Sequence, residues 1–326
     1  MSERSLLMSV ALTVALACTT AGCARSGQYM HDQQYYHPED QQSYYSNPNG
    51  ASPSDRIQSM GQPKKRIVVL DFWNDTPVTQ TDLGAFAADE LRRGLYLSQR
   101  VILPPDVKSQ LGTSDFIEGD RVKVAQLIRE GRRLGVSVVV IGRVTKVVFR
   151  QRGDEVGLFR QKQSLAAVDV EMKVFDVSGG REIAATRRSG EASNNAMVAF
   201  DGGNMESTAY RAELTKLAIR NAMGVAVPDI IRAIEKLQWQ GRVAKVAGSK
   251  VYVDAGKASG LVIGDILRVL TPGDDIYDPA TGAFLGRTQG QLKGTVEVVD
   301  FLGTDGAVTE IHTGGNFRTE DLVQLY

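Results

Sequence analysis

The chain has few of the side chains on which most enzymes depend. Its 326 residues include three histidines and two cysteines. It has no G-x-x-x-x-G-K-[ST] phosphate loop, no G-x-G-x-x-G after a strand, no H-E-x-x-H and no G-x-S-x-G. His31 and His37 fall in a polar segment where we expect solvated side chains, and His312 lies in a glycine-rich β segment without a serine motif. The composition predicts a protein that is not an enzyme and needs no cofactor or metal.

Net charge and long apolar runs are also missing. The 38 basic and 38 acidic residues cancel, whereas binding to nucleic acid requires a basic excess, so we expect no nucleic-acid partner. No motif for a small-molecule substrate is present either. The apolar stretch from Leu6 to Ala17 is shorter than the roughly 20 residues that a transmembrane helix needs, and no later stretch approaches that length.

The N-terminus has the pattern of a secretory signal, because the apolar stretch has the length of a signal-peptide core. Ala21-Gly22-Cys23 then places two small residues before a cysteine. This resembles a lipoprotein signal peptide over residues 1–22, which implies a lipid on Cys23 and a membrane anchor. Ala24 favours the outer membrane, with the chain facing the periplasm. Thr20 departs from the pattern, and an ordinary signal peptide with an incidental cysteine is the alternative. Since Cys18 would be removed, the mature chain would keep no free thiol.

Residues 23–63 are predicted to form a disordered tether behind the lipidated cysteine. They are rich in Gln, Tyr, Ser, Asn and Pro and have almost no aliphatic side chains, so they cannot bury enough surface to offset their ordering entropy. As a flexible coil this segment would average about 35 Å end to end. The doubled tyrosines at 35–36 and 44–45 are candidates for docking on a partner.

Residues 64–238 alternate strands and helices, which predicts an α/β or α+β body. The apolar run 67–70 is typical of a strand buried on both faces. Two amphipathic helices follow, the first with Thr81 or Asp82 as N-cap and the second stopped by Gly135. Strands are expected over 101–104 and 137–149, and a hairpin turns through 178–180. Pro228 predicts the start of a new helical segment, because proline fits a first helical turn and not an interior.

Residues 239–326 change to short strands separated by glycine turns. This pattern predicts a small all-β domain, a barrel of SH3-like type or a sandwich. YDPATG, at 277–282, suggests a Ca²⁺ loop together with Asp274 and Asp275, but the spacing and distal glutamate of such a loop are absent. A turn at a hairpin tip is the simpler interpretation of Asp278, Pro279 and Gly282.

Asp71 and Asp75 are the best candidates for catalytic carboxylates, because they follow a buried strand. General acid–base work needs a second group with a shifted pKa, or a metal, and the sequence supplies neither. Asp75 lies in Asn-Asp-Thr-Pro, which is common in turns. Asp71 is therefore interpreted as the structural end of the first core strand, holding Phe72 and Trp73 in position.

The order of several segments in the body resembles the CsgG-like family of outer-membrane lipoproteins. The matching segments are Val69-Leu70-Asp71-Phe72, residues 135–145 including Gly142, and residues 176–183. In that family, whose prototype is the curli secretion channel, subunits form a ring and each contributes two hairpins to a membrane barrel. Here those hairpins are expected near 146–170 and 186–210. In the first segment charged residues fall on both faces of the strands, and in the second the apolar face is too short to cross a membrane. We therefore expect the body without the pore.

The C-terminal segment resembles the C-terminal domain of flagellar assembly protein T, a component of a periplasmic ring around the flagellar motor. The matching segments are 251–256, 260–265 and 278–286. The combined resemblance predicts a non-enzymatic outer-membrane lipoprotein that forms a homo-oligomeric periplasmic ring as a structural part of a cell-envelope machine. The flagellar motor is the first candidate for that machine, and other envelope or motor proteins are the expected partners. A CsgG-like secretion channel subunit is the alternative, and a hydrolase using Asp71 is a weaker one.

Overall fold

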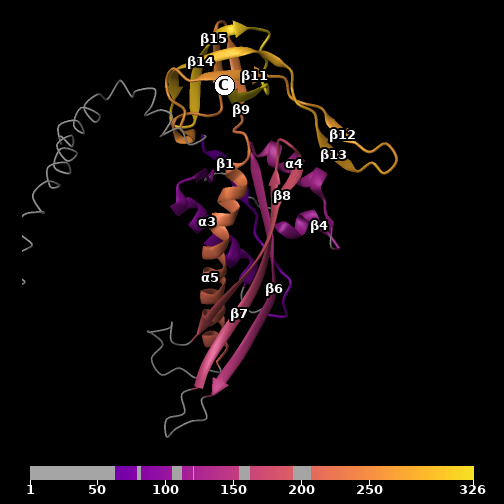
Figure 1. Ribbon diagram of the computed structural model, residues 1–326, viewed down its shortest axis with the longest axis vertical. Coiled ribbons are helices and arrows are strands. Elements are labelled where there is room, and N and C mark those ends of the chain that lie inside the picture. Colours follow the sequence, from indigo (N-terminus) through magenta and orange to yellow (C-terminus); the bar gives the residue numbers. More distant parts are fainter. Residues whose placement is uncertain (1–62, 79–81, 105–111, 120, 154–161, 194–206) are drawn as a thin grey trace, which may run out of the picture. The chain divides into compact units, whose positions relative to one another are not determined.

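The fold is described from a computed structural model (Figure 1). It describes residues 63–326 except 79–81, 105–111, 120, 154–161 and 194–206, and no side chains over 151–163. The predicted signal peptide, Cys23 and the predicted tether lie outside the described residues. All described residues fall in one compact unit, Gln62–Tyr326. Within it, the chain forms a mixed α+β body and a closed β-barrel.

A mixed sheet forms the centre of the body, with strand order β3-β1-β6-β7-β8. The strands nearest β1 run parallel, and β6, β7 and β8 form an antiparallel meander. A short strand β2 also pairs with β6. The bounds are β1 Lys65–Val69, β2 Trp73–Asn74, β3 Val101–Ile102, β6 Val138–Gly153, β7 Lys162–Asp176 and β8 Arg181–Ser193.

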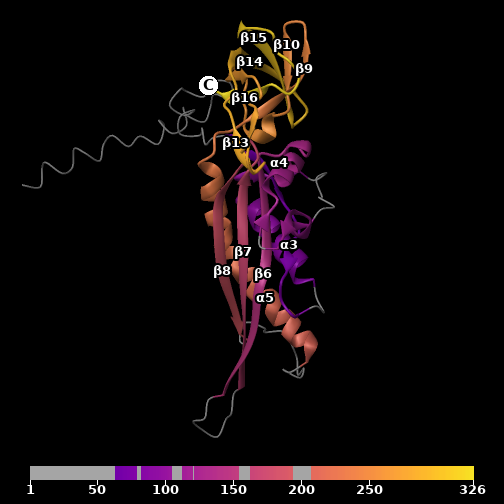
Figure 2. The same cartoon turned by 90° about the vertical axis from the view of Figure 1, so that its right-hand side faces the viewer.

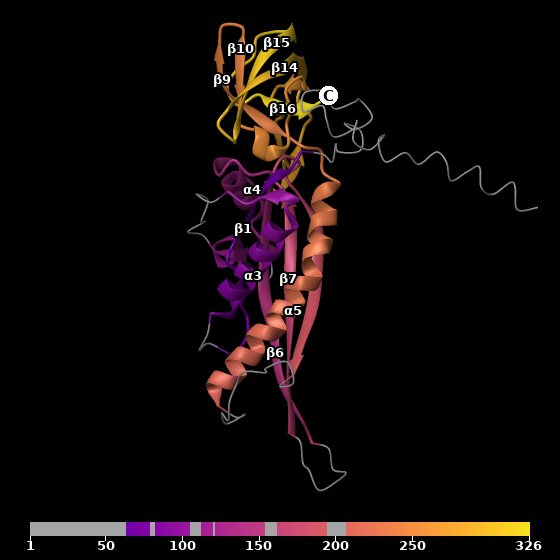
Figure 3. The same cartoon turned by 90° about the vertical axis from the view of Figure 1, so that its left-hand side faces the viewer.

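Helices cover both faces of β1, as its continuous apolar sequence predicts. Ile67 and Val69 face the cluster formed with α3 (Leu83–Ser98) and α5 (Thr208–Glu235). Val68 and Leu70 face α4 (Val124–Arg133) and the 3-10 turn Thr113–Phe116. The small hairpin of β4 (Ile117–Glu118) and β5 (Arg121–Val122) follows that turn. Figure 3 shows α3 and α5 on the same side of the sheet.

Helix α5 corrects the prediction for Pro228. The chain does not begin a new helix there, because α5 runs without interruption from Thr208 to Glu235 with Pro228 inside it. The proline has no N–H for the carbonyl of Gly224, one turn earlier, and its ring crowds that carbonyl. Helices accommodate this by bending, and Figure 3 shows α5 changing direction along its length. Burial of Ala226 and Ile230 against the sheet holds the helix together across the proline.

The C-terminal strands close into a six-stranded barrel in the order β10-β15-β14-β11-β16-β9. This confirms the predicted all-β, barrel-like architecture. Its core contains Trp239, Val243, Val251, Leu267 and Val296. The bounds are β9 Gly241–Ala247, β10 Lys250–Val253, β11 Ile266–Leu270, β14 Leu292–Leu302, β15 Gly306–Gly314 and β16 Leu322–Leu325, with a 3-10 turn at Lys257–Ser259.

A separate two-stranded hairpin leaves the barrel between β11 and β14. It consists of β12 (Asp275–Tyr277) and β13 (Phe284–Arg287), and Figure 1 shows it extending from the barrel. In the part of the chain that the structure describes, none of the helices is long and apolar enough to cross a bilayer.

Candidate functional site

Asp71 is part of a hydrogen-bond network that ties α3 to the end of β1. Its carboxylate oxygen Oδ1 accepts a hydrogen bond from Nη2 of Arg92 at 2.6 Å. Arg92 also donates from Nε and Nη2 to the carbonyl of Val69, at 3.1 and 2.7 Å. The Asp71 carbonyl accepts from the backbone N–H of Thr113 at 2.8 Å. These hydrogen bonds connect the end of β1 to α3 and to the 3-10 turn at Thr113. None of the three partners is a general base or a metal ligand.

Phe72 and Trp73 lie on opposite sides of the chain after β1. Phe72 is buried, whereas Trp73 is 37% exposed. Gly142 of β6 lies against the Phe72 ring, and a Cβ added there would be 2.6 Å from Phe72 Cε2. Gly142 is therefore needed for close packing of the ring.

Asp278, Pro279 and Gly282 form the tip of the β12–β13 hairpin, as the sequence predicts. Asp278 Oδ1 accepts hydrogen bonds from the backbone N–H groups of Ala280 and Thr281 at 2.8 and 2.7 Å. The bond from Thr281 holds the pKa of Asp278 below its usual value. Gly282 has φ +67°, which favours glycine. Among the described residues no group of three or more His, Cys, Asp and Glu side chains could hold a metal.

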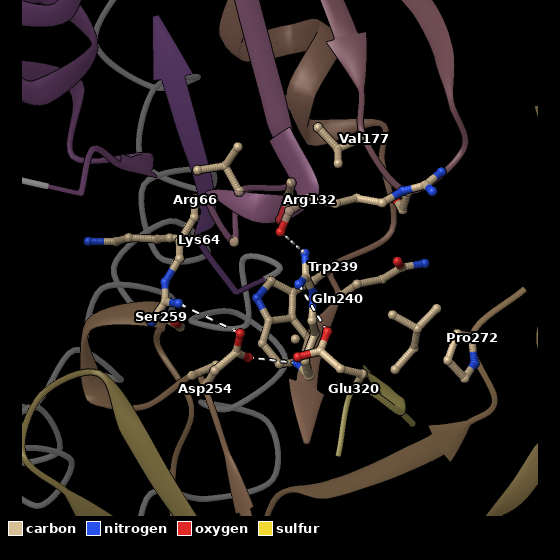
Figure 4. A pocket seen from close by; sticks show the side chains of 18 of the residues that line it. Lys64, Arg66, Arg132, Val177, Trp239, Gln240, Asp254, Ser259, Pro272 and Glu320 are labelled. Carbon is tan, nitrogen blue, oxygen red and sulfur yellow. Dashed lines mark hydrogen bonds and ion pairs between the residues drawn. The ribbon is translucent and has the colours of Figure 1, made fainter. Parts of the chain in front are cut away.

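A cavity lined by charged side chains lies where the body meets the barrel. This cavity of about 170 Å³ opens between the start of β1, the end of α4 and the first barrel strands. The chain is pinned beside it, because the N–H of Lys64 donates to the carbonyl of Ser259 at 2.8 Å. Figure 4 shows Asp254 and Glu320 on the barrel side, opposite Arg66 and Arg132 of the body.

Arg242 connects both sides of this cavity. Its backbone N–H donates to Asp254 Oδ1 at 2.6 Å, and its Nη1 donates to Glu320 Oε2 at 3.2 Å. Its Nη2 reaches across to the carbonyl of Arg132 at 3.1 Å. Arg66 of β1 lies 3.8 Å from Asp254 and adds a second charge interaction across the boundary.

The β12–β13 hairpin is attached to the body by an ion pair and an aromatic ring. Arg132 at the end of α4 binds both carboxylate oxygens of Asp275. The ring of Phe284 lies over Gly180, where a Cβ would be 2.4 Å from Phe284 Cε1. Gly180 has φ +67°, so the turn between β7 and β8 needs glycine for its backbone and for this contact.

Burial shifts several pKa values at this boundary. Burial raises the pKa of Asp254, and it outweighs the opposing hydrogen bond from Arg242 and the charges of Arg66 and Arg242. Hydrogen bonds from Arg132 hold the pKa of Asp275 below its usual value. Burial, with the nearby charge of Arg132, lowers the pKa of Arg287. The cationic groups here are thus crowded and only partly compensated.

A second cavity of about 410 Å³ adjoins the first and shares Ser178, Gln240, Arg287 and Leu322 with it. Its other polar side chains come from the end of β7 and the start of β8, from the segments after α5 and β13, and from β11 and β16. Three buried polar atoms without a hydrogen-bond partner among the described residues belong to residues lining these two cavities: Arg132 Nε, Gln240 Oε1 and Arg268 Nε. We call the two cavities together the junction cavity.

Sequence reasoning did not find the junction cavity, because its residues belong to no motif. They lie between positions 64 and 324 and meet only through the fold. The available signals were indirect: the basic start of β1, the arginines that end α4 and the glutamines around Trp239. Basic residues at the end of a helix are usually explained by the helix dipole.

Comparison with known proteins finds similar solved structures but no matching family. No protein-family model matches the chain, and no curated protein matches it. Similar solved structures include the hypothetical protein CT253 from Chlamydia trachomatis, with 15% identity and TM-score 0.32, covering 53% of this chain and 96% of that one. Lipoprotein GNA1162 from Neisseria meningitidis has 16% identity and TM-score 0.27, covering 52% and 99%. A PelC dodecamer from Paraburkholderia phytofirmans has 15% identity and TM-score 0.28, covering 54% and 90%.

These similarities concern about half of this chain, and their TM-scores are too low to carry an argument about function. The resemblances to the CsgG-like family and to flagellar assembly protein T stay predictions from the sequence.

Proposed function

We propose that this chain is a non-enzymatic lipoprotein of the outer membrane whose periplasmic part forms a homo-oligomeric ring. It would serve as a structural component of a cell-envelope machine, with the flagellar motor as the first candidate. The lipid would be attached to Cys23, and the segment up to residue 63 would set the distance between membrane and body. The choice of a cell-envelope machine rests on the sequence resemblances. The proposed surface for assembly is an edge of the sheet in the body.

The observation that carries assembly is the open edge of β8. This strand is 13 residues long and pairs with β7, and no strand of the described part of the chain pairs with its other edge. Helix α5 packs on its face, where the carbonyl of Ala218 lies so close to Gly190 that a Cβ would be 2.0 Å from it. Two β8 carbonyls accept hydrogen bonds from side chains, Glu191 from Asn221 and Arg187 from Arg188. The remaining groups of the outer edge could pair with a strand of another copy. A ring follows if that copy contributes a different edge, because head-to-tail contacts can close into rings.

The face of the sheet opposite α5 supports contact with water. Arg143, Glu171 and Arg187 form an ion-paired row across β6, β7 and β8 on this face. Asp169 accepts a hydrogen bond from Ser189 beside them. This charged and hydrogen-bonded row is unfavourable for contact with lipid.

The secretion-channel alternative has one structural observation in its favour. β6 and β7 have 16 and 15 residues, longer than the roughly 9 to 11 residues of a membrane-spanning strand. Figure 2 shows these strands side by side with α5 behind them. Because α5 covers one face and charged side chains line the other, we favour the ring without a pore.

The test is to purify the full-length lipidated protein in detergent and measure its mass by light scattering and its shape by negative-stain imaging. Rings of uniform size support the proposal, and monomers at high concentration contradict it. Successive strand residues point their N–H groups to opposite edges, so Ala185→Pro and Thr186→Pro form a matched pair. The proline that removes an N–H facing β7 should lower thermal stability, because it breaks a hydrogen bond between β7 and β8. The proline that removes an N–H facing outward should abolish the ring and leave thermal stability nearly unchanged.

Two further measurements separate the remaining parts of the proposal. Cys23→Ser should move the protein from the membrane to the soluble fraction, and unchanged fractionation would remove the lipid anchor. An increase in ion conductance on adding the purified protein to planar bilayers would replace the structural ring by the channel.

A further inference from the structure

We propose that the junction cavity is a binding site for a hydroxyl-rich anion, an acidic sugar or a sugar phosphate, that bridges the body and the barrel. The sequence predicts no small-molecule ligand, and the proposal does not depend on ring assembly. Four observations support it: the excess of cationic side chains around the cavity, the buried polar atoms without a hydrogen-bond partner among the described residues, the volume of the cavity, and the glutamine side chains that line it.

The first observation is the excess of positive charge around the cavity. Eight cationic side chains line it, against three carboxylates, in a chain whose net charge is zero. Asp274 and Asp275 lie near Arg287 and still leave the cations in excess. The cationic residues are Lys64, Arg66, Arg132, Arg181, Lys236, Arg242, Arg268 and Arg287. Guanidinium groups are suited to bidentate recognition of carboxylate and phosphate.

The second observation is unsatisfied hydrogen-bonding capacity on the cavity-lining residues. Arg132 Nε and Arg268 Nε are buried donors without a partner among the described residues, and Gln240 Oε1 is a buried acceptor in the same situation. Buried polar atoms in proteins nearly always have a partner, and a missing one calls for a ligand, an ion or water. Gln240 lines both cavities, so a molecule that fills them can reach this side chain from either part.

Arg132 and Arg268 come from different parts of the fold. Arg132 ends α4 of the body, and Arg268 lies in β11 of the barrel. A ligand that contacts both side chains therefore connects α4 to β11, in addition to the hydrogen bonds and ion pairs described above between the body and the barrel. Binding should stabilise the junction in the folded state, because the site does not exist in the unfolded chain.

Size and lining define the ligand class. The two volumes, about 170 and 410 Å³, bring the junction cavity into the range of small-molecule pockets. Besides its cations, the lining has four glutamine side chains: Gln238, Gln240, Gln289 and Gln324. Carboxamides donate and accept hydrogen bonds, so they suit the hydroxyl groups of a sugar. An inorganic ion would leave most of these groups without a partner. The lowered pKa of Arg287 agrees with cations that an anion would compensate.

The experiment titrates the full-length protein with four probes at constant ionic strength and follows the melting temperature and the heat of binding. The probes are glucose 6-phosphate, glucuronate, glucose and sodium phosphate. We expect saturable binding and a raised melting temperature with glucose 6-phosphate or glucuronate, and the stronger of the two identifies the anionic group. Glucose should bind at least tenfold more weakly.

Substitutions then locate the site. Arg268→Gln and Arg287→Gln should each weaken binding of the preferred probe at least tenfold. Arg318→Gln removes the same charge from an exposed position of the barrel outside the cavity lining and should leave binding unchanged. If one cavity variant fails to fold, the other still decides the question.

Three results would overturn the proposal. Absence of saturable binding by both anionic sugars is one. Equal binding of sodium phosphate and glucose 6-phosphate is the second, because it would indicate an adventitious ion only. An equal loss of binding in Arg318→Gln is the third, because it would indicate general charge attraction. None of these results depends on whether the protein forms a ring.

Discussion

Arg132 and Asp275 form a two-point ion pair between the body and the β12–β13 hairpin. The Nη1–Oδ2 and Nη2–Oδ1 distances are 2.7 and 2.9 Å. The two residues are 143 positions apart in the chain, and their side chains are 23% and 28% exposed. This geometry makes the pair a main attachment of the hairpin.

We expect Arg132→Met to lower the free energy of unfolding by about 1–2 kcal/mol, because a partly buried carboxylate loses two charge-assisted hydrogen bonds. Arg133→Met is the matched control. Arg133 is exposed and pairs with Glu130 on its own helix, and such a solvent-screened pair contributes little to stability. Urea unfolding of both variants measures the difference. Equal losses would show that the pair does not attach the hairpin.

Asp254 and Asp275 should respond to pH in opposite directions. Burial raises the folded-state pKa of Asp254 above its usual 3.8, so the folded chain binds this proton more tightly than the unfolded chain. The group therefore lowers stability as pH rises from 3.8 through its folded-state pKa. The pKa of Asp275 is lowered, so its contribution is complete above 3.8 and is lost as pH falls through its folded-state pKa.

It follows that Asp254→Asn should be neutral or stabilising at pH 7, because the amide can still accept the Arg242 N–H without a buried charge. Asp275→Asn should be destabilising at pH 7. Both differences from the wild type should shrink when the pH falls below 3.8. Unfolding by urea at pH 7 and pH 3.5 measures them. A destabilising Asp254→Asn at pH 7 would show that the ion pair with Arg66 outweighs desolvation.

Gly142 and Gly224 should respond oppositely to alanine. At Gly142 the new methyl group would meet the buried Phe72 ring at 2.6 Å, and we expect a loss of about 1–3 kcal/mol from overpacking. Gly224 in α5 has open space at its Cβ position, so alanine should raise stability by about 0.5–1 kcal/mol through helix propensity. Thermal or urea unfolding checks both. Phe72→Leu combined with Gly142→Ala should recover part of the loss, and no recovery would point to another cause.

Local sequence signals predicted those elements that short-range interactions determine. The N-cap of α3 is Asp82, whose Oδ1 accepts from the Ala85 N–H at 2.9 Å. Helix α4 ends just before Gly135, which has φ +68°. The hairpin tip at Asp278 and Gly282 also follows from local turn chemistry. In each case the capping or turn residue and its partner lie within a few positions of each other.

Features that arise from packing between distant segments could not be predicted from the sequence. Pro228 predicts a helix start from local chain geometry alone, but the packing of α5 on the sheet keeps the helix continuous. The junction cavity needs β1, α4 and the barrel to meet, and single arginines such as Arg132 and Arg242 give no pattern before they do. The sequence predicts Asp71 at a strand end, but its partner Arg92, 21 residues later, follows only from the docking of α3.

That contact gives the last prediction. Asp71→Asn should lower stability by no more than about 1 kcal/mol, because the carboxylate is half exposed and Arg92 keeps its two hydrogen bonds to the Val69 carbonyl. Arg92→Met should cost more, since it also leaves that carbonyl without its side-chain donors. A double-mutant cycle measured by urea unfolding isolates the coupling between the two charges. If Asp71→Asn instead abolished a hydrolytic activity of the purified protein without changing its stability, Asp71 would have to be reinterpreted as a catalytic carboxylate.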